Sequence, residues 1–156
     1  MMTTIKAVTL CAALLGGASL LPGAQAGEPS ATHHIVKGMD VYLGVMPAAA
    51  VQALPEHEQA ERAMHRAPAG AGAYHVNLSL FDAVTHAAIR DAQVRVSVEQ
   101  VGLGSETRQL EPMSINGFVS YGNYFRLDSP RPYVIDVQIQ RPGLPEAHTR
   151  FQYQTF

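Results

Sequence analysis

Residues 73–82, AYHVNLSLFD, decide the fold, because their apolar side chains recur at every second position. Between Tyr74 and Leu80, the apolar residues alternate with His75, Asn77 and Ser79. Alternation with a period of two is typical of a half-buried β-strand. The stretch therefore predicts a strand with one face on an apolar core and the other toward polar surroundings.

The same alternation appears on both sides of this stretch. Further strands are predicted at residues 35–45, 94–99, 107–113, 118–127, 133–140 and 151–154, with a turn at Asn116-Gly117 between two of them. Gly, Pro, Asn and Asp separate the strands, and no helical crossovers lie between them. About seven such strands favour the all-β class, as an immunoglobulin-like antiparallel β-sandwich, over a parallel sheet.

The first 26 residues read as an export signal. Lys6 precedes an apolar run over residues 7–21, and Ala24-Gln25-Ala26 matches the small-x-small cleavage pattern. We expect a periplasmic protein that starts at Gly27 and is not inserted in the membrane after cleavage; a retained N-terminal anchor is the alternative. Cys11, the one cysteine, lies inside the signal, so the rest of the chain has neither a disulfide nor a thiolate ligand.

The remaining chain divides at the linker that ends at Gly72. Residues 27–72 are predicted to hold a leader, the first strand and an irregular or helical insertion, with a short helical turn at 48–54 that Pro55 ends. Residues 73–156 form the main sandwich, in one domain with 35–72. The formal net charge of -2 argues against a nucleic-acid binder. No G-x-S-x-G, P-loop, H-E-x-x-H or G-x-G-x-x-G motif is present, so we expect no enzyme.

Histidine and methionine carry the candidate chemistry. Imidazole suits copper, zinc, iron and nickel, whereas a thioether selects Cu(I). His75 lies on the polar side of its predicted strand, where it could meet His65, but it could equally be an exposed strand residue. His33 and His34 precede the first strand and could close over a site or belong to a solvated leader.

Two other features stay open in the same way. Met113 ends a predicted strand and could be a ligand or a core residue, because methionine fills irregular gaps. The stretch 121–125, YGNYF, could be a bulged strand whose rings pack the end of the sandwich, or an aromatic wall of a metal site.

Residues 73–155 resemble small exported β-sandwich proteins of the YtkA/FixH-like kind. More distantly, they are similar to periplasmic copper-binding proteins linked to bacterial iron uptake. The resemblance rests on Tyr74-His75-Val76, Phe81-Asp82, Ile89-Arg90-Asp91-Ala92, Leu110-Glu111-Pro112-Met113, Tyr121-Gly122-Asn123-Tyr124 and Arg141-Pro142-Gly143.

The resemblance to the iron-uptake proteins implies a copper ligand at Met113, the methionine of the Pro-Met pair. The histidine that these relatives carry before Tyr-Gly is Ser120 here, and a second one would fall near residues 40–42, which contain no histidine. His65 and His75, with His33 or His34, would then replace the missing ligands.

Two functions follow as expectations. The first is a periplasmic accessory protein that binds and delivers copper, or serves an iron-linked system, with a membrane transporter or a respiratory-oxidase system as partner. The alternative is a non-catalytic β-sandwich interaction module for a membrane-protein partner.

Overall fold

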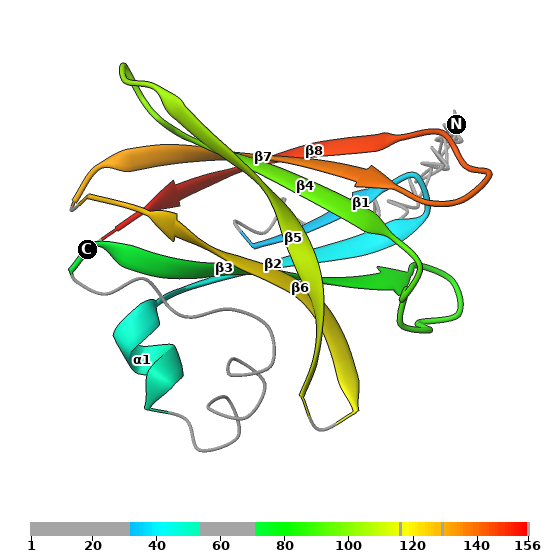
Figure 1. Cartoon of the computed structure of the whole chain (residues 1–156). Helices are drawn as coiled ribbons and strands as arrows, with labels where there is room; N and C mark the ends of the chain where they lie inside the picture. Colours follow the sequence, from blue (N-terminus) through cyan, green and yellow to red (C-terminus); the bar gives the residue numbers. More distant parts are fainter. Residues whose placement is uncertain (1–31, 54–70, 116, 129, 156) are drawn as a thin grey trace, which may run out of the picture.

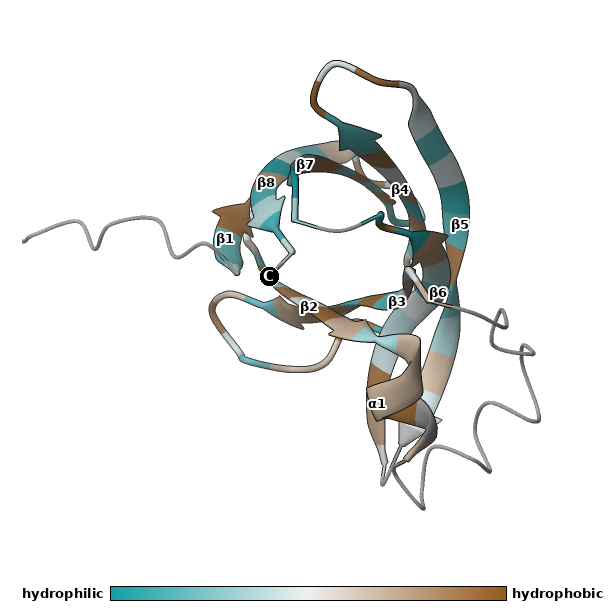
Figure 2. Ribbon diagram, turned by 90° about the vertical axis from the view of Figure 1, so that its left-hand side faces the viewer, coloured by the Kyte–Doolittle hydropathy of each residue, from teal (hydrophilic) through white to brown (hydrophobic). Residues whose placement is uncertain are grey.

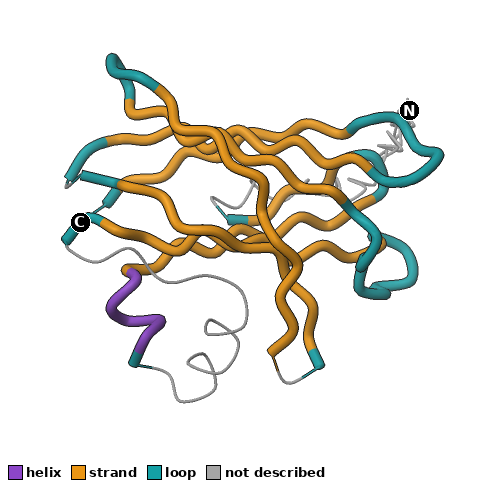
Figure 3. Tube along the Cα trace, in the orientation of Figure 1, coloured by secondary structure: helices purple, strands orange, loops and turns teal. Residues whose placement is uncertain are grey.

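The computed structural model describes residues 32–53, 71–115, 117–128 and 130–155. These ranges contain eight strands and one short helix (Figures 1 and 3). The predicted export signal, His65 and most of the predicted insertion lie outside the described residues. The elements are β1 (His33–Val36), β2 (Met39–Pro47), α1 (Ala48–Gln52), β3 (Ala73–Asp82), β4 (Gln93–Gln100), β5 (Ser105–Ile115), β6 (Phe118–Arg126), β7 (Pro132–Gln140) and β8 (Ala147–Gln154).

All strand pairs are antiparallel, which confirms the predicted all-β class. The strands follow the order β1-β2-β3-β6-β5-β4-β7-β8 in one hydrogen-bonded sheet. Instead of two separate sheets, the two halves are continuous, because β5 pairs with β4 along one part and with β6 along the other. Figure 2 shows the strands arranged around a ring that is nearly closed, with β1 beside β8 and α1 outside.

The strand predicted at residues 35–45 is divided in two in the structure. Lys37 and Gly38 have φ of 45° and 74°, and they form the turn between β1 and β2. Two consecutive residues with positive φ make the tight hairpin turn whose twist matches that of its strands. This division accounts for the eighth strand in the described ranges.

The core fills the inside of the ring with the side chains that the alternation predicted. The apolar residues of β3, β4 and β7 are buried: Val76, Leu78, Leu80, Val94, Val96, Val98, Tyr133, Ile135, Val137 and Ile139. Removing this apolar surface from water is the main favourable contribution to folding. The opposite residues of β3, including His75 and Asn77, therefore face outward from the core.

The helix α1 begins directly after β2 and confirms the predicted helical turn over its described part. Ala48 packs on Ala73 and Tyr124 in a small apolar cluster that is separate from the core of the ring. The helix therefore covers the outer face of the sheet at one end of β3. Within the described ranges, no helix has the length and apolar character that crossing a membrane requires.

Candidate metal site on the outer face of β3, β5 and β6

The site is built around a row of four paired residues that crosses the sheet. Gly44 of β2 pairs with Asn77 of β3, which pairs with Gly122 of β6, which pairs with Glu111 of β5. We call these four residues the glycine row. Paired residues of antiparallel strands point to the same face, so the two glycines leave room there for the side chains of their neighbours.

His75 and Met113 occupy the space above Gly122. A β-carbon at Gly122 would lie 2.7 Å from Nε2 of His75 and 3.0 Å from Sδ of Met113. The two donor atoms therefore meet over the one position in this part of β6 that has no side chain. Both residues are well buried, with 4% and 7% of their surfaces exposed. The structure thus brings together two of the five predicted ligands, from strands that are far apart in the sequence.

Tyr124 lies beside this pair. The ring of Tyr124 meets the His75 imidazole edge to face, with centroids 5.0 Å apart and an interplanar angle of 62°. Because His75 and Tyr124 are paired across β3 and β6, the sheet itself sets this contact. In the aromatic stretch 121–125, Tyr121 and Phe125 enter the core, while Tyr124 forms a wall of the candidate site.

Asn77 contributes a buried polar atom to the same face. Its amide lies directly over Gly44, where a β-carbon would collide with Oδ1. This Oδ1 is shielded from solvent and has no hydrogen-bond partner in the described part of the chain. A buried acceptor without a partner costs free energy, so its presence two residues from His75 is typical of a site that receives a further group.

His33 and His34 have structural contacts elsewhere. Nε2 of His33 lies 2.7 Å from Oδ1 of the buried Asp40, and its ring stacks on Tyr42 at 4.2 Å. His33 pairs with Tyr42, whereas His75 pairs with Met46. Those two β2 positions differ by four residues, about 13 Å at the rise of a strand. The structure therefore places His33 away from the His75–Met113 pair.

His34 faces β8. Its Nδ1 lies 2.7 Å from Oγ1 of Thr149, and its ring stacks on Phe151 at 4.2 Å. His34 thus joins the two edge strands of the sheet, and it does not approach His75. Across the ranges that the structure describes, no group of three or more His, Cys, Asp or Glu side chains is arranged to hold a metal ion. A metal site formed at His75 by described residues would therefore draw on the Met113 thioether.

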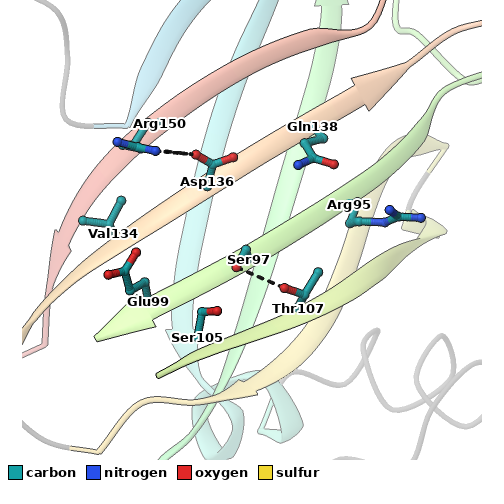
Figure 4. A pocket seen from close by; sticks show the side chains of 9 residues that line it. All are labelled: Arg95, Ser97, Glu99, Ser105, Thr107, Val134, Asp136, Gln138 and Arg150. Atoms are coloured by element: carbon teal, nitrogen blue, oxygen red, sulfur yellow. Dashed lines mark hydrogen bonds and ion pairs between the residues drawn. The ribbon is translucent and has the colours of Figure 1, made fainter. Parts of the chain in front are cut away.

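A polar hollow lies on the outer face of the other half of the sheet (Figure 4). This polar groove has a volume of about 300 Å³ and contains no histidine or methionine. In its middle, Oγ1 of Thr107 lies 3.1 Å from Oγ of Ser97, and Asp136 accepts a hydrogen bond from Arg150. None of the predicted site residues lines this groove, and its hydroxyl and ion-pair chemistry does not favour a soft metal.

The sequence put forward His75 and Met113 as candidates, but it did not reveal the glycine row. Asn77 carries a signal in the sequence, since it lies two residues after His75 on the same face of the strand. Glu111 likewise lies two residues before Met113. The role of Gly122 depends on the pairing register of three strands, which the sequence does not display.

Comparisons with known proteins support the fold. A DUF4426 family protein from Pseudomonas aeruginosa PAO1 is similar at a TM-score of 0.66 and 13% identity, over 80% of this chain and 94% of that protein. The copper-bound Glu-to-Gln variant of FetP from uropathogenic Escherichia coli strain F11 gives 0.60 and 11%, over 78% and 92%. Copper-reconstituted P19 from Campylobacter jejuni gives 0.60 and 8%, over 78% and 91%. Identities this low show a shared fold alone.

No family model matches the chain. No curated protein matches it in sequence either.

The residues present nevertheless fit a copper ion. An imidazole and a thioether meet over Gly122, and on the same face a buried amide oxygen without a described partner lies over Gly44. Imidazole binds copper in either oxidation state, and a thioether favours Cu(I). Three features of one face therefore agree with a copper site, and each is a property of this chain.

Proposed function

We propose that this chain is a periplasmic accessory protein that binds copper reversibly between His75 and Met113. The observation that carries the proposal is the position of the two donor atoms, each within 3.0 Å of one point above Gly122. The fold that this chain shares with copper-bound FetP and P19 supports it.

The chemistry of the two donors favours Cu(I). Both are neutral when they bind, and the thioether is a soft ligand. The pair lies on the outer face of the sheet rather than inside the ring, so a bound ion would not displace the apolar core. Shielding by Tyr124 and α1 lowers the local dielectric constant, which strengthens binding once water has left. A copper ion bound by these two residues could be released again and delivered to a partner.

The location and the partner are part of the proposal. The export signal predicted at residues 1–26 supports a periplasmic protein, as does the structural likeness to FetP, which was recombinantly expressed in the periplasm of E. coli. A membrane transporter or a respiratory-oxidase system would receive the copper, or the protein would serve an iron-linked system. We also propose that the chain is related to the YtkA/FixH-like proteins and that its sheet derives from an immunoglobulin-like sandwich. The proposed role is metal binding and delivery, without a catalytic reaction.

The interaction module is the second candidate, and one observation favours it. Phe118 is 74% exposed at the tip of the β5–β6 hairpin, which projects from the ring in Figure 1. An exposed aromatic ring on a projecting hairpin is suited to contact with a protein. The two candidates are compatible, because a delivery protein must also dock on its partner.

A competition titration of the purified protein with Cu(I) against a chromogenic chelator tests the copper site. We expect one equivalent to bind, and His75→Ala and Met113→Leu each to weaken binding by about tenfold or more, since each removes one of few ligands. His148→Ala, at an exposed residue of β8, is the matched control and should bind as the wild type does. His65→Ala tests the remaining predicted ligand.

Binding without a defined stoichiometry, or an unchanged affinity in both His75→Ala and Met113→Leu, would contradict the proposal. The interaction module would then be the better account of the protein. A loss of binding in His148→Ala would show that surface histidines hold the metal.

A further inference from the structure

Glu111 is the one acidic residue of the glycine row. It pairs directly with Gly122 across β5 and β6, and it lies two residues before Met113 on the same strand. Both relations place Glu111 on the face that carries His75 and Met113. Directly paired residues have β-carbon positions about 5 Å apart, and an extended glutamate carboxylate covers most of that distance, so Glu111 can meet an ion held over Gly122.

The Glu111 carboxylate is available to a ligand. In the described part of the chain, it has neither an ion pair nor a hydrogen bond, whereas Glu106 on the same strand is paired with Arg108. Glu111 is also half-buried, so its charge is less well solvated than that of a fully exposed residue. A half-buried carboxylate without a described partner is stabilised when a cation comes within reach.

We propose that Glu111 supplies an oxygen ligand with which the site also holds Cu(II); this inference rests on the proposed copper site. Oxygen and nitrogen donors are typical of Cu(II), while the thioether favours Cu(I). Glu111 thus binds Cu(II), Met113 binds Cu(I), and His75 binds copper in both oxidation states. The other polar residues around Gly122, Asn77 and Ser120, are neutral and cannot offset the second charge of Cu(II).

The test compares the two oxidation states in one pair of variants. In Glu111→Gln, we expect the Cu(II) dissociation constant to rise by about tenfold or more, and that of Cu(I) to change by less than about threefold. Met113→Leu should show the reverse preference, with Cu(I) affected more than Cu(II). Affinities come from competition with chelators specific for each state, and the electron paramagnetic resonance spectrum of the Cu(II) form should change in Glu111→Gln.

Glu99→Gln is the matched control, because Glu99 is an exposed carboxylate on the outer face of β4, and its replacement changes the net charge equally. If Glu99→Gln lost as much Cu(II) affinity as Glu111→Gln, the loss would be due to the change in net charge alone, and the inference would be overturned. Unchanged Cu(II) affinity in Glu111→Gln, or an equal loss of both states, would overturn it as well. If the wild type binds neither state, the proposed function fails too, so the two failures are distinguishable.

Discussion

At the scale of single residues, the decisive feature is the absence of a side chain at Gly122. The glycine is needed here for space: the β-carbon of any other residue would take the position where the His75 imidazole and the Met113 sulfur meet. Gly104, at the end of the β4–β5 connection, has nothing within 4 Å of the same position. Gly122 is therefore required for the space it leaves to the two donors, whereas Gly104 has no neighbour that an added side chain would meet.

Gly122→Ala should weaken Cu(I) binding by about tenfold, because the added methyl group must push the two donors apart. The protein should remain folded, since the methyl group meets the far ends of side chains rather than backbone. Chelator competition measures the affinity, and circular dichroism checks the fold. Gly104→Ala should have no effect. Equal affinity in Gly122→Ala and the wild type would show that the two donors do not act together.

The residue types and the resemblance at the Pro-Met pair put forward His75 and Met113 as candidate ligands. Apart from Cys11 the chain has no cysteine, so imidazole and thioether are its candidate soft donors. Together they favour copper. Asn77 and Glu111 could not be identified in this way, because amides and carboxylates are common on the polar faces of strands. They become members of the site only when the pairing register places them beside Gly122.

At the scale of elements, Tyr121 fixes the connection between β3 and β4 to the sheet. Its hydroxyl donates a hydrogen bond to the carbonyl of Ile89 at 3.1 Å and accepts one from the amide of Ala92 at 3.2 Å. Burial raises the pKa of the Tyr121 phenol above its ordinary value of 10.0. Tyr121 also precedes Gly122, so this anchor holds β6 in register beneath the candidate site.

Tyr121→Phe should lower the free energy of unfolding by about 1–2 kcal/mol at neutral pH, because a buried carbonyl and a part-buried amide lose their partner. The raised pKa adds a pH dependence: the contribution of the tyrosine is complete below pH 10 and is lost as the pH rises through the folded-state pKa. Urea unfolding at several pH values measures this difference. A gap between the two proteins that widens above pH 10 would contradict the account.

The alternation of side chains predicted most strands because it depends only on neighbours in the sequence. The turn at Lys37-Gly38 was missed because a lysine with φ of 45° is uncommon, although the following glycine is typical of such turns. As a result, His33 and His34 were placed before the first strand, whereas they belong to an edge strand whose contacts keep them from the His75–Met113 pair.

At the scale of the whole molecule, the ring depends on the divided pairing of β5. Where β5 leaves β6 to pair with β4, Nδ2 of Asn123 donates a hydrogen bond to the carbonyl of Gln109 at 2.8 Å. The side chain thus satisfies a backbone group at the fork. Such a fork involves three strands at once, so the strand pattern predicted two separate sheets rather than one continuous sheet.

The same fork positions the site. It directs the second part of β5 alongside β6, so that Met113 of β5 and His75 of β3 meet over Gly122 from the two sides of β6. His34 closes the ring at the other side, between β1 and β8. The architecture therefore keeps the copper ligands on the outer face, while the apolar core holds the strands that carry them.

The most direct test of the His75–Met113 site is X-ray absorption at the copper edge of the Cu(I)-loaded protein. The account predicts nitrogen and sulfur neighbours in the first shell, with the sulfur contribution lost in Met113→Leu. A wild-type spectrum with no sulfur neighbour, unchanged in Met113→Leu, would contradict it, because the copper would then be bound by histidines elsewhere on the protein.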